Sequence, residues 1–269
     1  MNEFVQIGYG QLGLASLLIV INLVLSFLLR LSLGRRLVVA ALRMTVQLLL
    51  VGLVLEWIFS INRPLPILSM ALVMAALAGI AAVNRTRRRF PGIYWNSLVS
   101  VLTASFLVTG LALTGILRID PWFDPQYLIP LLGMVLGNAL TGVSLGLDRF
   151  MENCVQNRSL IESFLCLGAT RWEAAHGEVK EALRTGMIPV INSMMIMGVV
   201  SLPGMMTGQI LAGASPIDAV RYQIVIMFMI ASCTALATLG AVLLAFRTMF
   251  SHRHELRSHH LRTTGKRLF

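Results

Sequence analysis

The chain has 269 residues, of which 57% are hydrophobic and only 13% charged, and its mean hydropathy is +0.78. Soluble domains carry about 25% charged residues, so this composition excludes a disordered chain, a small disulfide-stabilised scaffold and an ordinary soluble enzyme. The net charge of +10 suits membrane-topology signals better than a nucleic-acid interface, which would need more exposed polar surface. We therefore expect an all-α, polytopic protein of the lipid bilayer, with no nucleic-acid partner.

Seven segments are long and apolar enough to cross the hydrocarbon core as helices, which takes about 20 residues. Their apolar runs are continuous and lack the alternation of a transmembrane β-barrel. We expect residues 1–250 to form one membrane domain and residues 251–269 a basic cytosolic tail. The predicted spans are residues 8–29, 37–59, 65–83, 94–117, 126–147, 186–212 and 222–246.

The basic residues are divided unequally between the two sides of these spans. Eighteen of the 22 Lys and Arg residues fall in the C-terminal tail and in every second connection. Connections rich in Lys and Arg remain on the cytoplasmic side of a membrane. The distribution predicts an outside N-terminus and a cytoplasmic C-terminus, which requires an odd number of spans.

The second span contains the charged residue Arg43, with Gln47 one helical turn later on the same face. Ionisable groups inside a membrane usually face a bundle interior or water. Arg43 is also close enough to the cytoplasmic end for its guanidinium to extend to the headgroups. Both placements are open, and Gln47 favours the inward one, with both residues on a substrate path.

The fifth span combines small and polar residues on one side. Gly142 and Gly146 are four residues apart, a spacing that lets helix backbones approach closely. Asn138, Thr141 and Ser144 lie among them and give the span a small, polar face. This pattern is typical of a helix that lies inside a bundle or lines a pathway, and Asn138 is a candidate path residue.

The sixth span is interrupted at Ser201, Pro203 and Gly204, which are followed by Met205 and Met206. Proline kinks a helix and frees backbone carbonyls, as in the broken helices that line transporter sites. These five residues are therefore predicted to lie near a substrate path. Methionine thioethers can bind soft metal ions but are also ordinary packing groups, so the sequence assigns no metal ligand.

The polar segment 148–185 is too charged to span the bilayer and too regular to be a linker. Phe164 and Leu167 belong to an apolar stripe at helical spacing, with Glu162 on the opposite side. A transporter driven by a separate motor needs such an apolar element for a soluble partner to bind. A surface helix lying on the membrane would show the same spacing.

Two short helices are expected to meet within this segment. Gly168 would end the first helix, and Ala169 follows it. Thr170 with Glu173 three residues later forms a capping-box pattern that would begin the second.

Several motifs resemble a known family. Glu162 followed by Gly168-Ala169-Thr170 is similar to a degenerate EAA loop of ABC importer permeases. Longer motifs resemble the FetB family of bacterial permeases over roughly residues 8–250: RMTVQLLLVG (43–52), PLLGMVLGNA (130–139), SLPGMMTG (201–208) and GASPIDAVRYQ (213–223). That family comprises membrane subunits of an iron-associated ABC-type exporter and plant aluminium-tolerance relatives.

The resemblance implies a multi-pass permease of the bacterial inner membrane, not an enzyme, which exports a metal ion such as iron. It also implies a homodimer and a separate ATPase subunit, which would carry ATP and Mg while this chain carries no cofactor. Residues 162, 164 and 167–170 would then couple the two subunits. The alternatives are a stand-alone secondary transporter or channel for a small solute or metal chelate, and an assembly or signalling subunit without transport.

Overall fold

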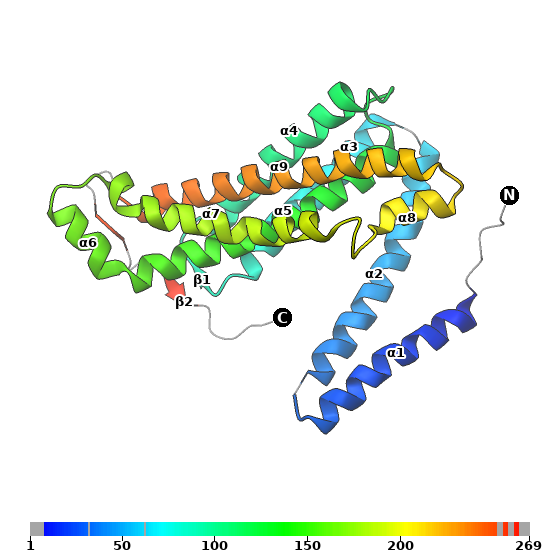
Figure 1. The fold of residues 1–269 in the computed structure, drawn as a ribbon, viewed down its shortest axis with the longest axis horizontal. Helices are drawn as coiled ribbons and strands as arrows, with labels where there is room; N and C mark the ends of the chain where they lie inside the picture. Colours follow the sequence, from blue (N-terminus) through cyan, green and yellow to red (C-terminus); the bar gives the residue numbers. More distant parts are fainter. Residues whose placement is uncertain (1–7, 32, 62, 252–254, 258–260, 264–269) are drawn as a thin grey trace.

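The computed structural model describes residues 8–31, 33–61, 63–251, 255–257 and 261–263 (Figure 1). The described residues are helical apart from two very short strands and the connections. In chain order the elements are α1 (Tyr9–Leu28), α2 (Gly34–Ile61), α3 (Pro64–Asn84), β1 (Arg88–Arg89), α4 (Ile93–Leu111), the π-helix η1 (Ala112–Ile116), α5 (Pro125–Gln156), α6 (Arg158–Cys166), α7 (Arg171–Ile196), α8 (Gly204–Leu211), α9 (Pro216–Met249) and β2 (Arg262–Thr263).

Six helical stretches within the described residues are long and apolar enough to cross a membrane. This confirms the predicted all-α, multi-pass class, and each stretch overlaps one of the predicted spans. Only the predicted sixth span, residues 186–212, has no counterpart among these stretches. The six stretches are Gly10–Leu28, Gly34–Ser60, Pro64–Asn84, Ile93–Ile116, Pro125–Gln156 and Pro216–Met249.

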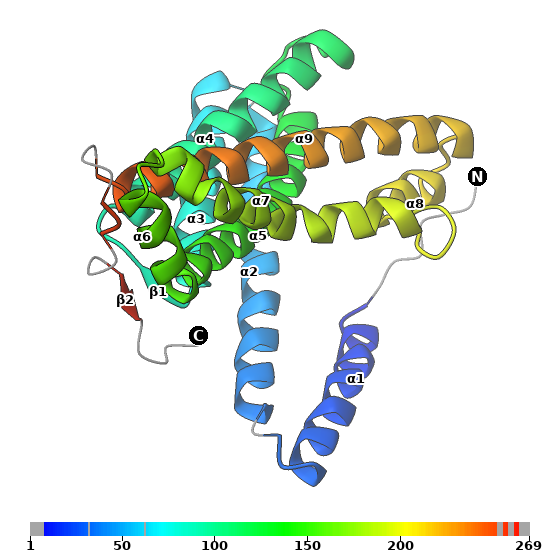
Figure 2. The ribbon, with the colours of Figure 1, turned by 60° about the vertical axis from the view of Figure 1, so that its left-hand side comes forward.

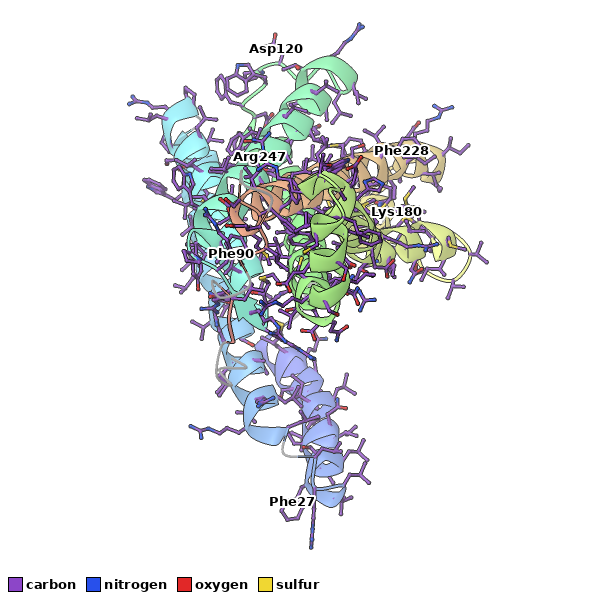
Figure 3. All side chains as sticks on the ribbon, turned by 90° about the vertical axis from the view of Figure 1, so that its left-hand side faces the viewer. Phe27, Phe90, Asp120, Lys180, Phe228 and Arg247 are labelled. Atoms are coloured by element: carbon purple, nitrogen blue, oxygen red, sulfur yellow. The ribbon has the colours of Figure 1, made fainter. Side chains whose placement is uncertain are left out.

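Helices α1 and α2 form an arm that projects away from the remaining helices (Figures 1 and 2). Most of their large apolar side chains are exposed, and Phe27, at the tip of the arm in Figure 3, is 84% exposed. Of the α2 side chains that the structure describes, only Ile58 is buried. An arm so apolar on all sides is compatible only with a lipid or protein environment.

The body of the molecule is built around α5, α7 and α9, which pack against one another. Helix α3 packs against α4 and α5, and α4 also packs against α5 and α9. The core lies along α5 and α9, where Leu132, Val143 and Leu147 of α5 and Ala237 and Ala241 of α9 are no more than 1% exposed. Helix α5 has 32 residues and α9 has 34. At 1.5 Å per residue both are about 50 Å long, which is more than the hydrocarbon core of a bilayer.

Three glycine backbones allow the central helices to touch. A methyl group placed on Gly186 of α7 would lie 2.8 Å from the carbonyl oxygen of Gly142 of α5 and 2.8 Å from Cγ2 of Thr238 of α9. A methyl group on Gly146 would lie 2.6 Å from the same Cγ2 atom. The predicted close approach at Gly142 and Gly146 is therefore present, and Gly186 is its counterpart on α7. We call this contact the glycine crossing.

The predicted sixth span does not form one helix. Its first residues belong to α7, which begins fifteen residues earlier at Arg171 and contains Pro189. The chain then leaves the helix at Met197, and α8 begins at Gly204. The interruption itself was predicted correctly, but the sequence boundary at residue 186 was wrong. The polarity of the residues before 186 suggested that the span begins there. Buried small residues such as Ala175 nevertheless hold this polar half of α7 against the body.

The segment 148–185, predicted as a cytosolic loop with two short helices, is mostly helical. Helix α5 continues to Gln156, α6 follows, and the first half of α7 completes the segment. The first of the two expected helices is short, but the second is the beginning of the 26-residue α7.

The arginine-rich connection between α3 and α4 lies at the same end as this segment. The backbone N–H of Arg87 donates to Oδ1 of Asp148 over 2.8 Å, and Arg88 Nε lies 3.1 Å from Oε2 of Glu152. Strand β1 pairs antiparallel with β2 of the C-terminal tail. Two of the basic connections and the tail are therefore gathered at one end of the body.

The glycine crossing gives a test of packing in the body. Gly142→Ala is expected to lower the stability by roughly 1–3 kcal/mol, because its methyl group would overlap α9. Gly137→Ala on the same helix meets nothing within 4 Å and is expected to raise stability by about 0.5–1 kcal/mol. Thermal unfolding in one detergent compares the two, and equal midpoints would contradict the crossing.

Candidate functional site

The turn between α6 and α7 is fixed by its backbone. Gly168 has φ +93°, a left-handed conformation that glycine adopts without strain. Its N–H donates to the carbonyl of Leu165 over 3.1 Å, and the N–H of Ala169 donates to the carbonyl of Phe164 over 3.0 Å. These bonds end α6 as a C-terminal glycine cap does. The predicted stop at Gly168 is therefore confirmed.

A capping box begins α7, as the sequence predicted. The N–H of Thr170 donates to Oε2 of Glu173 over 2.7 Å, and the N–H of Glu173 donates to Oγ1 of Thr170 over 3.3 Å. The Thr170 hydroxyl also donates to Oε2 over 2.8 Å. Hydrogen bonds from the Thr170 backbone and hydroxyl to this carboxylate lower the pKa of Glu173. The capping box thus fixes the start of α7 at Arg171, three residues after Gly168.

One side of α6 presents apolar side chains with no cover in the described structure. Leu160, Phe164 and Leu167 are 54%, 45% and 85% exposed, respectively, and together we call them the α6 face. On the other side Ile161 is buried against the body, and Glu162 pairs with Arg158 over 2.7 Å. An exposed apolar cluster of this kind is suited to contact another protein or a lipid surface.

The break after α7 contains the predicted path residues Ser201 and Pro203. The carbonyl of Ile196 accepts hydrogen bonds from the backbone N–H groups of Val200 and Ser201 over 3.0 and 3.4 Å, respectively. Gly198 has φ +82°, and its N–H donates to the carbonyl of Ser201. The break is therefore a tight, hydrogen-bonded turn at one end of a continuous helix.

Helix α8 follows the break and packs against α9. Gly204, Met205 and Met206 form its first turn; the two methionines are half-buried and Gly204 is exposed. Met205 packs against the core. The structure brings these residues together with Ser201 and Pro203, as predicted.

The remaining predicted path residues lie elsewhere. Asn138 of α5 is half-buried, and its amide nitrogen donates to the carbonyl of Met134 over 2.9 Å. Arg43 and Gln47 are exposed on the arm, where the described residues provide neither side chain with a hydrogen bond. Their inward, paired placement is not found within this chain. The structure does not bring them together with the break.

Sequence reasoning missed several polar residues near the break. Gln223 of α9 is 7% exposed, and its amide nitrogen lies 3.9 Å from Sδ of Met197. Its oxygen, the hydroxyl of the neighbouring Tyr222 and the side-chain oxygen of Gln209 in α8 are buried without hydrogen-bond partners among the described residues. Their presence in otherwise apolar segments was the signal that could have identified them.

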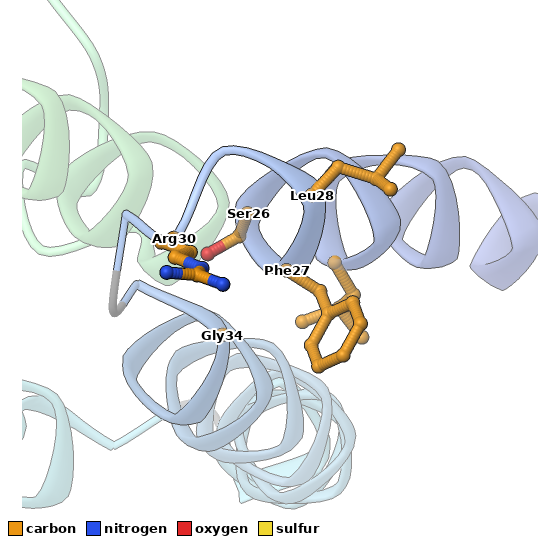
Figure 4. Close-up of a pocket in the computed structure, with 6 residues that line it drawn as sticks. Ser26, Phe27, Leu28, Arg30 and Gly34 are labelled. Atoms are coloured by element: carbon orange, nitrogen blue, oxygen red, sulfur yellow. The ribbon is translucent and has the colours of Figure 1, made fainter.

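Metal-ligating groups do not cluster in the described part of the chain, where no three His, Cys, Asp or Glu residues come together. A hollow of about 620 Å³ lies at the turn between α1 and α2 (Figure 4). Ser26, Arg30 and Gly34 line it together with apolar side chains. It contains none of the predicted path residues, and it is open on the arm.

These features define a multi-pass α-helical membrane protein with a helix break at one end of the body, after α7, and an exposed apolar helix, α6, at the other. The family described as Uncharacterised protein family (UPF0014) matches residues 9–250. The chain belongs to this family.

Named relatives cover nearly the whole chain. The probable iron export permease protein FetB of Escherichia coli is 32% identical over 91% of this chain and 93% of its own. The Arabidopsis thaliana protein ALUMINUM SENSITIVE 3 is 32% identical over 94% and 91%, and the Bacillus subtilis membrane protein YjkA is 34% identical over 93% and 98%. No solved structure matches the chain. The predicted FetB-family resemblance is confirmed.

The capping box gives a local test. Thr170→Ala removes the hydroxyl that accepts from Glu173, so the first-turn amides of α7 should exchange with deuterium faster, while Thr170→Ser should retain their protection. The stabilisation from Glu173 is complete above the ordinary carboxyl pKa and is lost as pH falls through the lowered value. Protection measured at pH 7 and pH 3, corrected for intrinsic exchange, should therefore fall at pH 3. Unchanged protection in Thr170→Ala would contradict the assignment.

Proposed function

We propose that this chain is the membrane subunit of an ABC-type transporter that exports a metal ion such as iron. A separate ATPase subunit supplies ATP hydrolysis with its own Mg, and two copies of the permease form the transport unit. The observation that carries the proposal is the continuity of α7. This single helix begins at the turn beside the α6 face and ends at the break.

The geometry supports a mechanical role for α7. A force applied to the α6 face reaches α7 through the turn at Gly168 and the capping box at Thr170. Because α7 packs against both α5 and α9, its displacement would alter the glycine crossing and the segment that contains Ser201 and Pro203. Residues 162, 164 and 167–170 thus form the ATPase-coupling surface.

The proposed topology has an outside N-terminus and a cytoplasmic C-terminus in the bacterial inner membrane. Counting α7 as the seventh crossing supports it, because α7 returns the chain from the end where α5 finishes to the end where α9 begins (Figure 1). The tail, the α3–α4 connection and the polar half of α7 then share the cytoplasmic side. This arrangement places the α6 face where a soluble ATPase can bind.

The metal substrate is proposed from the name of the Escherichia coli relative, a probable iron export permease. The membrane part offers a neutral route: Asn138 and the residues around the break carry no charge. An ion passing such groups would be bound weakly, as transport requires.

The α6 face provides the test of the transporter assignment. Leu167→Glu places a charge in this 85%-exposed apolar contact and should abolish co-purification of a nucleotide-binding protein with the tagged chain from native membranes. In vesicles reconstituted with that protein, ATP-dependent movement of iron should fall at least tenfold. Ser159→Glu adds the same charge on α6 about 80° around the helix axis from Leu167 and should leave both measurements unchanged.

Three outcomes would contradict the proposal. If no nucleotide-binding protein accompanies the wild-type chain, the ABC assignment fails, and a stand-alone transporter or channel takes its place. If Leu167→Glu and Ser159→Glu behave alike, the α6 face is not the coupling surface. If the partner hydrolyses ATP without any iron flux, the metal assignment fails.

A further inference from the structure

The buried side of α9 carries a row of polar side chains whose oxygens have no hydrogen-bond partner among the described residues. These atoms are Oε1 of Gln223 and the hydroxyl oxygens of Thr234 and Thr238. The three residues are 7%, 0% and 0% exposed, respectively. The nitrogen of Gln223 faces the sulfur of Met197, so its oxygen is the free end of the amide. We call these three residues the α9 row.

The α9 row follows the axis of the helix. At 100° per residue, Gln223, Thr234 and Thr238 lie within about 60° of one another, on the same side of α9. Fifteen residues separate the first from the last, which corresponds to about 22 Å at 1.5 Å per residue. This length is most of a hydrocarbon core of about 30 Å, and the buried apolar side chains of Met227 and Ile230 lie on the same side of α9 between Gln223 and Thr234.

The two threonines differ from others in the chain. Thr114, Thr207 and Thr248 each donate their hydroxyl to the backbone carbonyl four residues earlier, over 2.8, 3.0 and 2.9 Å, respectively. This is the ordinary way for a helical threonine to satisfy its hydroxyl away from water. Thr234 and Thr238 lack that bond although both are fully buried. A buried polar group without a partner is unfavourable, so these hydroxyls need a partner from outside the chain.

The inner end of the row is closed by the glycine crossing. A methyl group on Gly142 would lie 2.9 Å from Oγ1 of Thr238, and one on Gly186 would lie 2.8 Å from its Cγ2 atom. Thr238 is therefore enclosed by the backbones of α5 and α7. A shift of α7 away from α5 would uncover Thr238 and extend the row towards the cytoplasmic end.

We propose that the α9 row is the route along which a dehydrated divalent cation crosses the body, bound in turn by Gln223, Thr234 and Thr238. The inference rests on the proposed transport function and names the groups that would contact the substrate. Uncharged oxygens replace part of the hydration shell and release the ion readily. The thioether of Met197 beside Gln223 favours a borderline-soft ion such as Fe²⁺ over Mg²⁺.

The test removes the hydroxyls while keeping their shape. Thr234→Val and Thr238→Val are reconstituted with the ATPase subunit in vesicles and assayed for ATP-dependent movement of ⁵⁵Fe²⁺. Each variant should transport at least tenfold more slowly than the wild type. Each should also unfold at the same or a higher temperature, because an unpartnered buried hydroxyl is lost.

Thr109→Val is the matched control. Thr109 of α4 is 3% exposed and its hydroxyl is also unpartnered, but it lies outside the α9 row. Its replacement should have the same effect on unfolding and leave iron movement unchanged. A third variant, Gln223→Leu, should reduce the preference for Fe²⁺ over Mg²⁺ in competition, whereas Gln126→Leu at the exposed start of α5 should not.

The outcomes separate this inference from the proposed function. If the wild type moves iron and both valine variants move it equally well, the row holds only packing groups or trapped water, and the inference alone is overturned. If the valine variants and Thr109→Val lose transport together, the loss is not specific to the row, which also overturns it. Absence of ATP-dependent iron movement by the wild type overturns the proposed function and this inference with it.

Discussion

The close contact of three helices at the glycine crossing is the constraint on which the rest of the body depends. Gly142 of α5 and Gly186 of α7 bring two backbones together, and Thr238 of α9 fills the remaining space. Without side chains at the two glycines, α7 can pack against both α5 and α9 as far as Val190. The position of α7 then determines where the turn at Gly168 and the break at Met197 are found.

The apolar pattern of the sequence was sufficient to predict six of the membrane helices, because continuous hydrophobic runs have few other uses at this length. Local signals also predicted the details of the α6–α7 turn. Gly168 and the Thr170–Glu173 pair act through bonds within a few residues, so their effect does not depend on the rest of the fold. The interruption at residues 201–204 was predictable for the same reason.

The start of α7 and the contacts of Arg43 could not be predicted in this way. Helix α7 is polar over its first half, and it is held by small residues that contact α5 and α9, a tertiary effect that hydropathy does not record. For Arg43 the sequence left two placements open, and Gln47 on the same helical face favoured the inward one, but α2 belongs to an arm outside the body. The α9 row was missed because Thr234 and Thr238 resemble ordinary helical threonines until their bonds are examined.

The proposed mechanism follows from what these parts can and cannot do. A route lined by Gln223, Thr234 and Thr238 has no group that takes up or releases a proton near neutral pH, so it cannot by itself couple transport to a proton gradient. In the proposed mechanism, the free energy for export then enters elsewhere. The α6 face and α7 would provide that connection, because a soluble ATPase bound at the α6 face could displace α7 without approaching the route itself. The positions of α6, α7 and α9 therefore favour a transporter in which energy enters at the α6 face while the substrate crosses along a separate, uncharged route.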